Sequence, residues 1–156
     1  MANELDTTSF FDVNDNTALV CIDHQQYQKL VVPQLIDLNY KVHLGLFEED
    51  VLLKLKTYTY NVVVIYENFK GSKAENNPIL AEMMKQPGTQ RRQHFVILLS
   101  HRLTTNDAMA AFVQSVDQII NVADLANLKP VLRRGIAQYR ELYQAFHEIS
   151  QATSAA

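Results

Sequence analysis

The stretch Asn61–Glu67 reads NVVVIYE, and its five central residues form an unbroken run of β-branched and aromatic side chains. A strand that exposes one face alternates polar and apolar residues, whereas a strand covered on both faces is apolar throughout. Two further runs have the same character, Ala18–Ile22 (ALVCI) and Phe95–Leu99 (FVILL). The sequence therefore predicts three central strands of a sheet that carries helices on both of its faces.

Two more polar runs, Lys41–Leu44 (KVHL) and Gln118–Val122 (QIINV), fit strands at the edges of the same sheet. Strands that alternate with helices favour parallel pairing through right-handed crossovers. The expected fold is an α/β, doubly wound, five-stranded parallel sheet of the flavodoxin-like kind, with strand order 2-1-3-4-5. Helical spacing of apolar residues predicts the intervening helices at Gln25–Leu38, Glu48–Lys56, Ile79–Lys85, Thr105–Gln114 and Asp124–Ile149.

The bulk composition fits one domain, because 156 residues with 47% hydrophobic content can bury one core and two halves would each be poorly buried. We expect a flexible N-terminal arm over residues 1–16, the folded domain over 17–150 and a frayed tail over 151–156. The net charge is −3 and no block of five like charges occurs, which argues against nucleic acid as a partner. The basic pairs Arg91-Arg92 and Arg133-Arg134 are interpreted as solvated surface.

The single cysteine, Cys21, lies inside an apolar run, so it is interpreted as a small buried hydrophobe in a protein without disulfides. The N-terminus lacks the basic and apolar pattern of a secretory signal. No apolar run approaches the roughly 20 residues of a membrane span. We therefore expect a cytoplasmic protein with no membrane partner.

The first motif, LVCIDHQ, places Asp23 and His24 directly after the first strand, and NVVVIYENF ends the third strand on Tyr66 and Glu67. FVILLSH ends the fourth strand on Ser100, and DQIINV carries Asn121 in the fifth. In this order the chain resembles the receiver domains of bacterial two-component response regulators. That family has two acidic residues after the first strand, an aspartate that accepts phosphate after the third, a hydroxyl after the fourth and a Lys-Pro pair after the fifth.

The resemblance implies a degenerate phosphorylation site, because only Asp23 and Ser100 keep the family's residue types. His24 replaces the second acid, Tyr66 stands at the acceptor position and Asn121 replaces the lysine. A phenol does not replace a carboxylate as phosphoryl acceptor, and the missing lysine removes a cation that neutralises the phosphoryl oxygens. The prediction is a non-phosphorylated pseudo-receiver that is no enzyme and acts as a protein-interaction or adaptor module in bacterial signal transduction. The alternative is a working receiver that uses Mg²⁺ and an acidic residue such as Glu67.

Other chemistries are less well supported. Asp23, His24, Glu67 and His101 could meet at one sheet edge as a transition-metal set, but no local ligand spacing supports it, so no metal or cofactor is expected. The start TALVCIDHQQ is similar to that of isochorismatase-like hydrolases, but the second cysteine such an enzyme needs is missing. The loop HQQYQK also lacks the glycine and hydroxyls of a flavin phosphate loop.

The last predicted helix outlasts a sheet about five residues deep, so its final turns have nothing beneath them. Tyr139, Tyr143 and Phe146 follow one another along it at steps of four and three and form a candidate interaction surface. Since receiver-like domains often pair there, we expect a homodimer through the fourth helix, the fifth strand and the fifth helix. Tyr66 is expected to fill the former acceptor pocket and to hydrogen-bond a neighbour such as Ser100 or Asp23.

Overall fold

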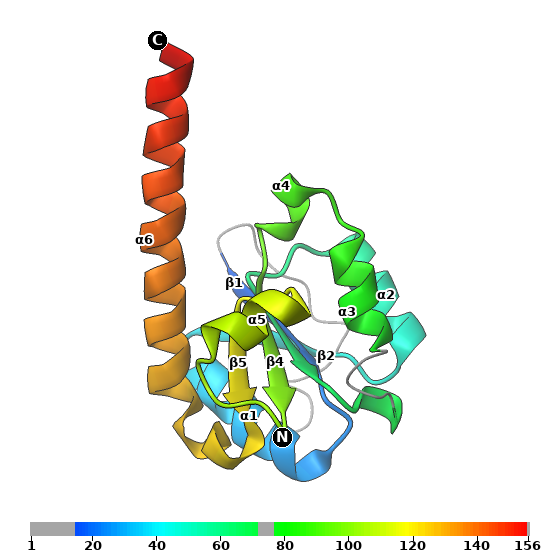
Figure 1. The fold of residues 1–156 in the computed structure, drawn as a ribbon. Coiled ribbons are helices and arrows are strands. Elements are labelled where there is room, and N and C mark those ends of the chain that lie inside the picture. The colour runs from blue at the N-terminus through cyan, green and yellow to red at the C-terminus, as the bar shows by residue number, and fades with distance from the viewer. Residues whose placement is uncertain (1–14, 72–76, 156) are drawn as a thin grey trace.

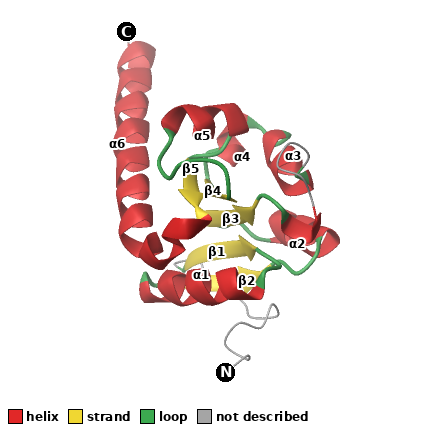
Figure 2. Ribbon diagram, turned by 60° about the horizontal axis from the view of Figure 1, so that its bottom comes forward, coloured by secondary structure: helices red, strands yellow, loops and turns green. Residues whose placement is uncertain are grey.

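The computed structural model describes residues 15–71 and 77–155, and within them it confirms the predicted fold class. All five strands are parallel, and their order is β2-β1-β3-β4-β5 (Figures 1 and 2). The apolar strands β1, β3 and β4 occupy the middle, as their unbroken apolar runs predict. The strands are β1 (Asn16–Cys21), β2 (Tyr40–Leu44), β3 (Val62–Tyr66), β4 (Phe95–Ser100) and β5 (Gln118–Asn121).

Helices cover both faces of the sheet (Figure 2). They are α1 (Gln25–Asp37), α2 (Glu48–Thr57), α3 (Pro78–Met84), α4 (Gly88–Arg91), α5 (Ala108–Gln114) and α6 (Leu128–Ala155), with 3₁₀ turns η2 (Phe69–Gly71) and η4 (Val122–Asn127).

Each central strand divides its side chains between two apolar layers. In β1, Val20 packs beneath α1 and α6, whereas Leu19 and Cys21 face α2 and α3. Because successive side chains of a strand point to opposite faces, a run of consecutive apolar residues is needed to fill both layers. This two-sided core fixes the positions of the loops at both ends of the strands.

Local signals explain several helix boundaries. Asn77 Oδ1 accepts hydrogen bonds from the amides of Ile79 and Leu80, and Pro78 opens α3, as the sequence predicts. Helix α1 continues through Pro33, which has no amide hydrogen to donate within the helix. Three buried side chains on the helix pack it against the sheet: Val31, Val32 and Leu35.

Three helical expectations need correction. Helix α6 begins at Leu128, after a 3₁₀ turn, and extends to Ala155, so the helix runs into the segment 151–156 that was expected to fray. Helix α5 begins only at Ala108, and its Met109, Phe112 and Val113 face solvent while the smaller Ala111 packs inward. The short helix α4 was not predicted. Residues 1–14, most of the expected arm, lie outside the described residues.

Helix α6 projects well beyond the sheet (Figure 1). Its 28 residues correspond to a length of about 42 Å at 1.5 Å per residue. Within residues 15–71 and 77–155, no helix is both long and apolar enough to cross a membrane.

Candidate functional site

The residues singled out in the sequence gather at the carboxyl edge of the sheet, where β1, β3 and β4 end side by side. Tyr66 pairs in register with Leu99, so the loops after β3 and β4 start at the same level. The structure joins Tyr66 and Glu67 to His101. It leaves Asp23 in a separate contact on the neighbouring loop.

Tyr66 is 8% exposed and ends β3 with its phenol turned into the cluster. Its hydroxyl and His101 Nε2 lie 2.8 Å apart and share a hydrogen bond. Tyr66 therefore bonds a neighbour, as expected, but the partner is His101 and neither of the two named candidates, because the imidazole after β4 reaches the phenol. Burial raises the pKa of Tyr66, and the neighbouring Tyr27, Asp23 and Glu67 raise it further. The phenol therefore stays neutral at physiological pH.

Two rings from the start of α1 complete an aromatic cluster around Tyr66. His24 stacks on Tyr27 with ring centroids 3.9 Å apart, and Tyr27 meets Tyr66 edge to face at 5.5 Å. His24 Nδ1 also accepts a hydrogen bond of 3.4 Å from the Tyr27 amide, which caps the helix. His24 thus orients Tyr27 against Tyr66. We call His24, Tyr27, Tyr66 and His101 the aromatic cluster.

Glu67 is 2% exposed and lies beneath the loop that follows β4. Its Oε1 accepts a 2.8 Å hydrogen bond from the His101 amide, and its Oε2 lies 3.8 Å from the Arg102 guanidinium. No hydrogen bond to Oε2 occurs within the described part of the chain. The carboxylate is enclosed by the protein and serves to hold the β4 loop.

Ser100 and Asn121 both stabilise turns. The buried Ser100 hydroxyl accepts hydrogen bonds of 3.1 Å from the amides of Arg102 and Leu103. Asn121 Nδ2 donates to the Leu103 carbonyl at 2.9 Å, and its Oδ1 accepts from the Ala123 amide at 2.9 Å. Their polar groups are therefore engaged with local backbone.

Asp23 is exposed, and its Oδ2 accepts a 2.9 Å hydrogen bond from the Lys70 amide. Lys70 has a left-handed backbone, with φ of 54°, so the loop after β3 makes a sharp turn there. This bond ties the loop after β3 to the loop after β1.

Asp23, His24, Glu67 and His101, the weakly supported metal candidates, are not grouped around one point. Among the residues that the structure describes, no three His, Cys, Asp or Glu side chains are placed to hold one ion. His101 Nε2 is turned to Tyr66, and His24 Nδ1 is used as a helix cap.

Sequence reasoning missed two members of this edge. Tyr27 falls within the predicted helix Gln25–Leu38 but was not among the candidate site residues, although its place three residues after the capping His24 positions it beside the strand ends. Asn77 Nδ2 donates to the carbonyls of Tyr66 and Glu67, at 3.1 and 3.3 Å, and so fixes the end of β3. These bonds span 11 and 10 residues of the chain, so no local sequence pattern indicates them.

The candidate interaction surface on α6 is only partly as expected. Tyr139 is half-buried in its own domain, since its hydroxyl donates to the Arg92 carbonyl at 2.9 Å and its ring meets Phe95 edge to face. Tyr143 stacks on Tyr139 and is 45% exposed. The side chain of Phe146 lies outside what the structure describes. Two apolar residues that the sequence analysis did not select, Leu142 and Ile149, are 73% and 67% exposed.

Solved structures of receiver domains share this fold. The signal receiver domain of a DNA-binding response regulator from Colwellia psychrerythraea matches with a TM-score of 0.62 at 16% identity, covering 79% of this chain and 99% of its own. The chemotaxis response regulator CheY4 of Vibrio cholerae gives 0.59 at 14% identity and covers 78% and 99%. The receiver domain of the Francisella response regulator 1452 gives 0.58 at 15% identity and covers 82% and 99%.

Neither a protein-family model nor a curated protein sequence matches the chain. At these identities the likeness extends to the fold, which is that of the receiver domains of two-component response regulators. Nearly all of each receiver aligns, yet about a fifth of this chain has no counterpart in it.

Proposed function

We propose that this protein is a receiver-like module that accepts no phosphoryl group and acts by binding other proteins. The observation that carries the proposal is the state of Tyr66, which stands at the position that the resemblance assigns to the phosphate acceptor. Its phenol is buried and hydrogen-bonded to His101. A neutral phenol in this setting is a poor nucleophile, and its ring fills space that an acyl phosphate would need.

The state of Glu67 argues against the alternative of a working receiver. A carboxylate that accepts phosphate must reach solvent and a bound cation, whereas Glu67 is 2% exposed and holds the His101 amide. Asp23 is the exposed carboxylate, but His24 beside it supplies an imidazole in place of the second oxygen ligand that Mg²⁺ favours.

The charge balance at this edge supports the same proposal. Phosphoryl transfer relies on cations that neutralise the oxygens of the transferred group. Asn121, at the position assigned to the family's lysine, is neutral, and its amide already donates to the Leu103 carbonyl.

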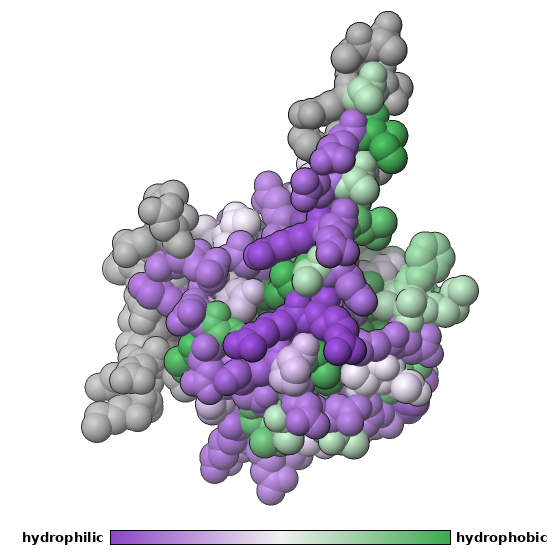
Figure 3. Space-filling model, turned by 90° about the vertical axis from the view of Figure 1, so that its left-hand side faces the viewer, coloured by the Kyte–Doolittle hydropathy of each residue, from purple (hydrophilic) through white to green (hydrophobic). Residues whose placement is uncertain are grey.

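The partner that we propose is a second copy of this chain, bound through the face made by α5, β5 and α6. Helix α5 exposes Met109, Phe112 and Val113. In the projecting part of α6, apolar side chains gather along one edge of the helix, drawn in green in Figure 3. Helices α5 and α6 both lie on the side of the sheet that β5 borders (Figures 1 and 2).

A two-fold dimer would cover such a surface with a copy of itself. Leaving a large apolar side chain exposed forgoes about 1.5–3 kcal/mol of burial free energy, so covering several of them favours association. In this scheme the domain would pass a signal through its oligomeric state or through proteins bound to the dimer.

The test of the missing phosphorylation is incubation with acetyl phosphate and Mg²⁺, followed by intact mass spectrometry. We expect no mass gain of one phosphoryl group. We also expect that beryllofluoride and Mg²⁺, which mimic the phosphorylated state, leave the NMR spectrum of the backbone amides unchanged. A phosphoryl adduct on the wild type that disappears in Glu67→Gln would establish the alternative instead. An adduct that disappears only in Asp23→Asn would equally overturn the proposal.

A further inference from the structure

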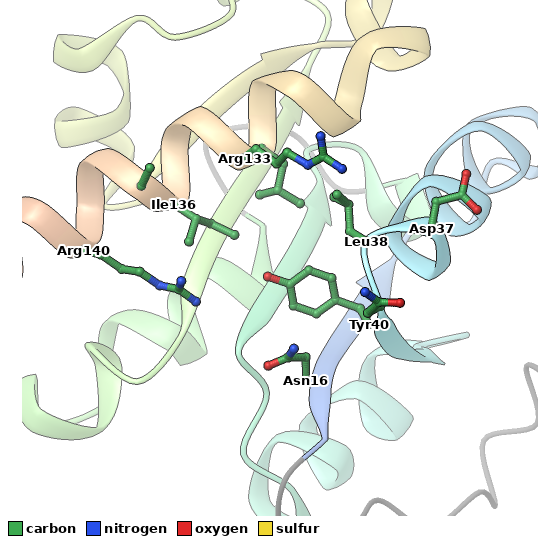
Figure 4. A pocket seen from close by; sticks show the side chains of 10 residues that line it. Asn16, Asp37, Leu38, Tyr40, Arg133, Ile136 and Arg140 are labelled. Atoms are coloured by element: carbon green, nitrogen blue, oxygen red, sulfur yellow. The ribbon is translucent and has the colours of Figure 1, made fainter.

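A hollow of about 370 Å³ lies at the amino ends of β1 and β2, on the opposite edge of the sheet from the aromatic cluster (Figure 4). Its floor is the junction between α1 and β2, and one wall is α6. The volume falls within the range of about 300–1,000 Å³ that is typical of small-ligand sites.

The floor is shaped by a tight reversal of the chain. Asn39 has a left-handed backbone, with φ of 67°, and its amide donates to the Ile36 carbonyl at 2.9 Å, which ends α1. The chain then enters β2 with the half-buried ring of Tyr40 turned toward α6 (Figure 4). The amide side chains of Asn16 and Asn39 also line the hollow.

The wall on α6 carries two arginines seven residues apart, Arg133 and Arg140, and therefore on one face of the helix. Arg140 extends toward Tyr40 and Asn16, whereas Arg133 extends toward Leu38 (Figure 4). Both are exposed, and neither makes an ion pair or side-chain hydrogen bond with any residue in 15–71 or 77–155. Both guanidinium groups are therefore available to a ligand in the hollow.

The hollow has an excess of positive charge in a chain whose net charge is −3. Its one acidic lining residue, Asp37, lies 3.5 Å from the Lys129 ammonium, which balances it. The two arginines remain in excess. Burial raises the pKa of Tyr40, and the Arg140 guanidinium lowers it in part. The cation and the phenol therefore interact electrostatically across the hollow.

We propose that this hollow binds a small phosphorylated ligand of nucleotide size, with its phosphates held by Arg133 and Arg140. One guanidinium group can donate two parallel hydrogen bonds to the oxygens of a phosphate. Such charge-assisted hydrogen bonds are stronger than those between neutral groups. The Tyr40 hydroxyl and the amides of Asn16 and Asn39 supply donors and acceptors for the remainder of the ligand. The carbonyl end of α1 disfavours an anion here, so the two guanidinium groups together must outweigh that effect.

The test is calorimetric titration of the full chain with ADP, GDP, pyrophosphate, citrate and adenosine. We expect one of the nucleoside diphosphates to bind, pyrophosphate to bind more weakly and adenosine not to bind. Arg133→Gln and Arg140→Gln should each weaken binding about tenfold, and the double variant about a hundredfold. Arg134→Gln removes the same charge from a neighbouring exposed residue outside the hollow, and it should leave affinity unchanged.

Three outcomes would overturn the inference. One is the absence of binding by every phosphorylated probe at millimolar concentration. Another is an equal loss in Arg134→Gln, since a diffuse charge effect would then explain the binding. The third is that citrate binds as tightly as the nucleotides, which would mean a general anion site. The melting temperature of the double variant tests for a purely structural role. If the two arginines only stabilise the end of α1, their removal would lower the melting temperature and leave the affinity for the ligand unchanged.

Discussion

At the scale of single residues, Tyr66 and Glu67 at the end of β3 make two different contacts with His101. Tyr66 is the last residue of β3 and Glu67 begins the turn after it; the phenol enters the aromatic cluster, while the carboxylate bonds the His101 amide in the β4 loop. His101 meets both, through its ring and through its backbone amide. One histidine after β4 therefore links two residues that would otherwise act independently.

Restoring an acidic residue at the end of β3 should not restore phosphorylation. In Tyr66→Asp the position assigned to the family's lysine is still the neutral Asn121, whose amide donates to the Leu103 carbonyl, so the cation that the chemistry needs is missing. We expect no phosphoryl adduct with acetyl phosphate and Mg²⁺ in intact mass spectra of this variant. The double variant Tyr66→Asp with Asn121→Lys is the matched comparison, and strong labelling of the single variant would show that the lysine position is unimportant.

A second residue-scale prediction concerns His94, which is buried at the start of β4. Its Nδ1 donates to the Tyr60 carbonyl at 2.7 Å, and its Nε2 is buried without a hydrogen-bond partner in the described residues. Burial lowers the pKa of His94, and the nearby Arg91 lowers it further. The hydrogen bond to the Tyr60 carbonyl and the charge of Asp117 raise the pKa, but the net shift is downward. The folded state therefore favours the neutral ring.

The unfolded chain binds the proton at its ordinary pKa of about 6.5. The contribution of His94 to stability is therefore complete above that pH and is lost as the pH falls toward the lower folded pKa. We expect the melting temperature to fall between pH 7.5 and 5.5, and to fall less in His94→Asn. Equal pH dependence in both proteins would contradict this assignment.

At the scale of elements, α6 belongs to two environments. Its first turns bury Leu128 and Leu132 against the sheet. Its later turns extend beyond the sheet, where Leu142 and Ile149 are exposed (Figure 1). Leu128 and Leu132 cover the core, whereas Leu142 and Ile149 lie at different angles around the helix and face outward. The apolar residues of α6 therefore form two separate stripes.

The proposed dimer gives a prediction for this element. Leu142→Glu places a charge in the exposed apolar stripe and should shift the mass measured by light scattering from dimer to monomer, with an unchanged circular dichroism spectrum. Gln144→Glu adds the same charge on the opposite side of α6 and should leave the dimer intact. A wild-type protein that is monomeric at high micromolar concentration would exclude this surface as a self-association site.

At the scale of the whole molecule, stability comes from two apolar layers that share one sheet. Leu35 on α1 belongs to one layer and Leu98 on β4 to the other, and both are essentially fully buried. Because every central strand contributes to both layers, loss of packing in either should weaken the entire domain.

Leu35→Ala and Leu98→Ala should each lower the free energy of unfolding by about 2–5 kcal/mol. Leu53→Ala removes the same atoms from a side chain that is 65% exposed, and it should cost about 0.5 kcal/mol or less. Urea denaturation followed by circular dichroism measures all three. A separate transition for one of the buried variants would mean that the two layers unfold independently.

The sequence alone was enough to predict the strands, their order and the two-sided core, since these depend on local apolar runs and on the alternation of strand and helix. It also indicated that Asp23, His24, Glu67 and His101 could meet at one edge, because parallel strands end together. The structure brings Glu67 and His101 into contact, whereas Asp23 bonds the Lys70 amide. The hydrogen-bond partners of these side chains could not be predicted from the sequence. The bonds from Tyr66 to His101 and from Glu67 to the His101 amide depend on the relative height of two loops.

Surface roles likewise depended on the tertiary structure. Arg91, interpreted as solvated surface, in fact lies 3.1 Å from Asp117 and also donates to the His94 and Ser115 carbonyls. Arg133 instead lines a hollow with Tyr40, which is far from it in the chain. Apolar periodicity indicates which side of a helix is buried over the sheet, but not where the sheet ends or which charged residue meets a partner. Those features arise only when distant segments pack, because they depend on distances between segments that no local pattern encodes.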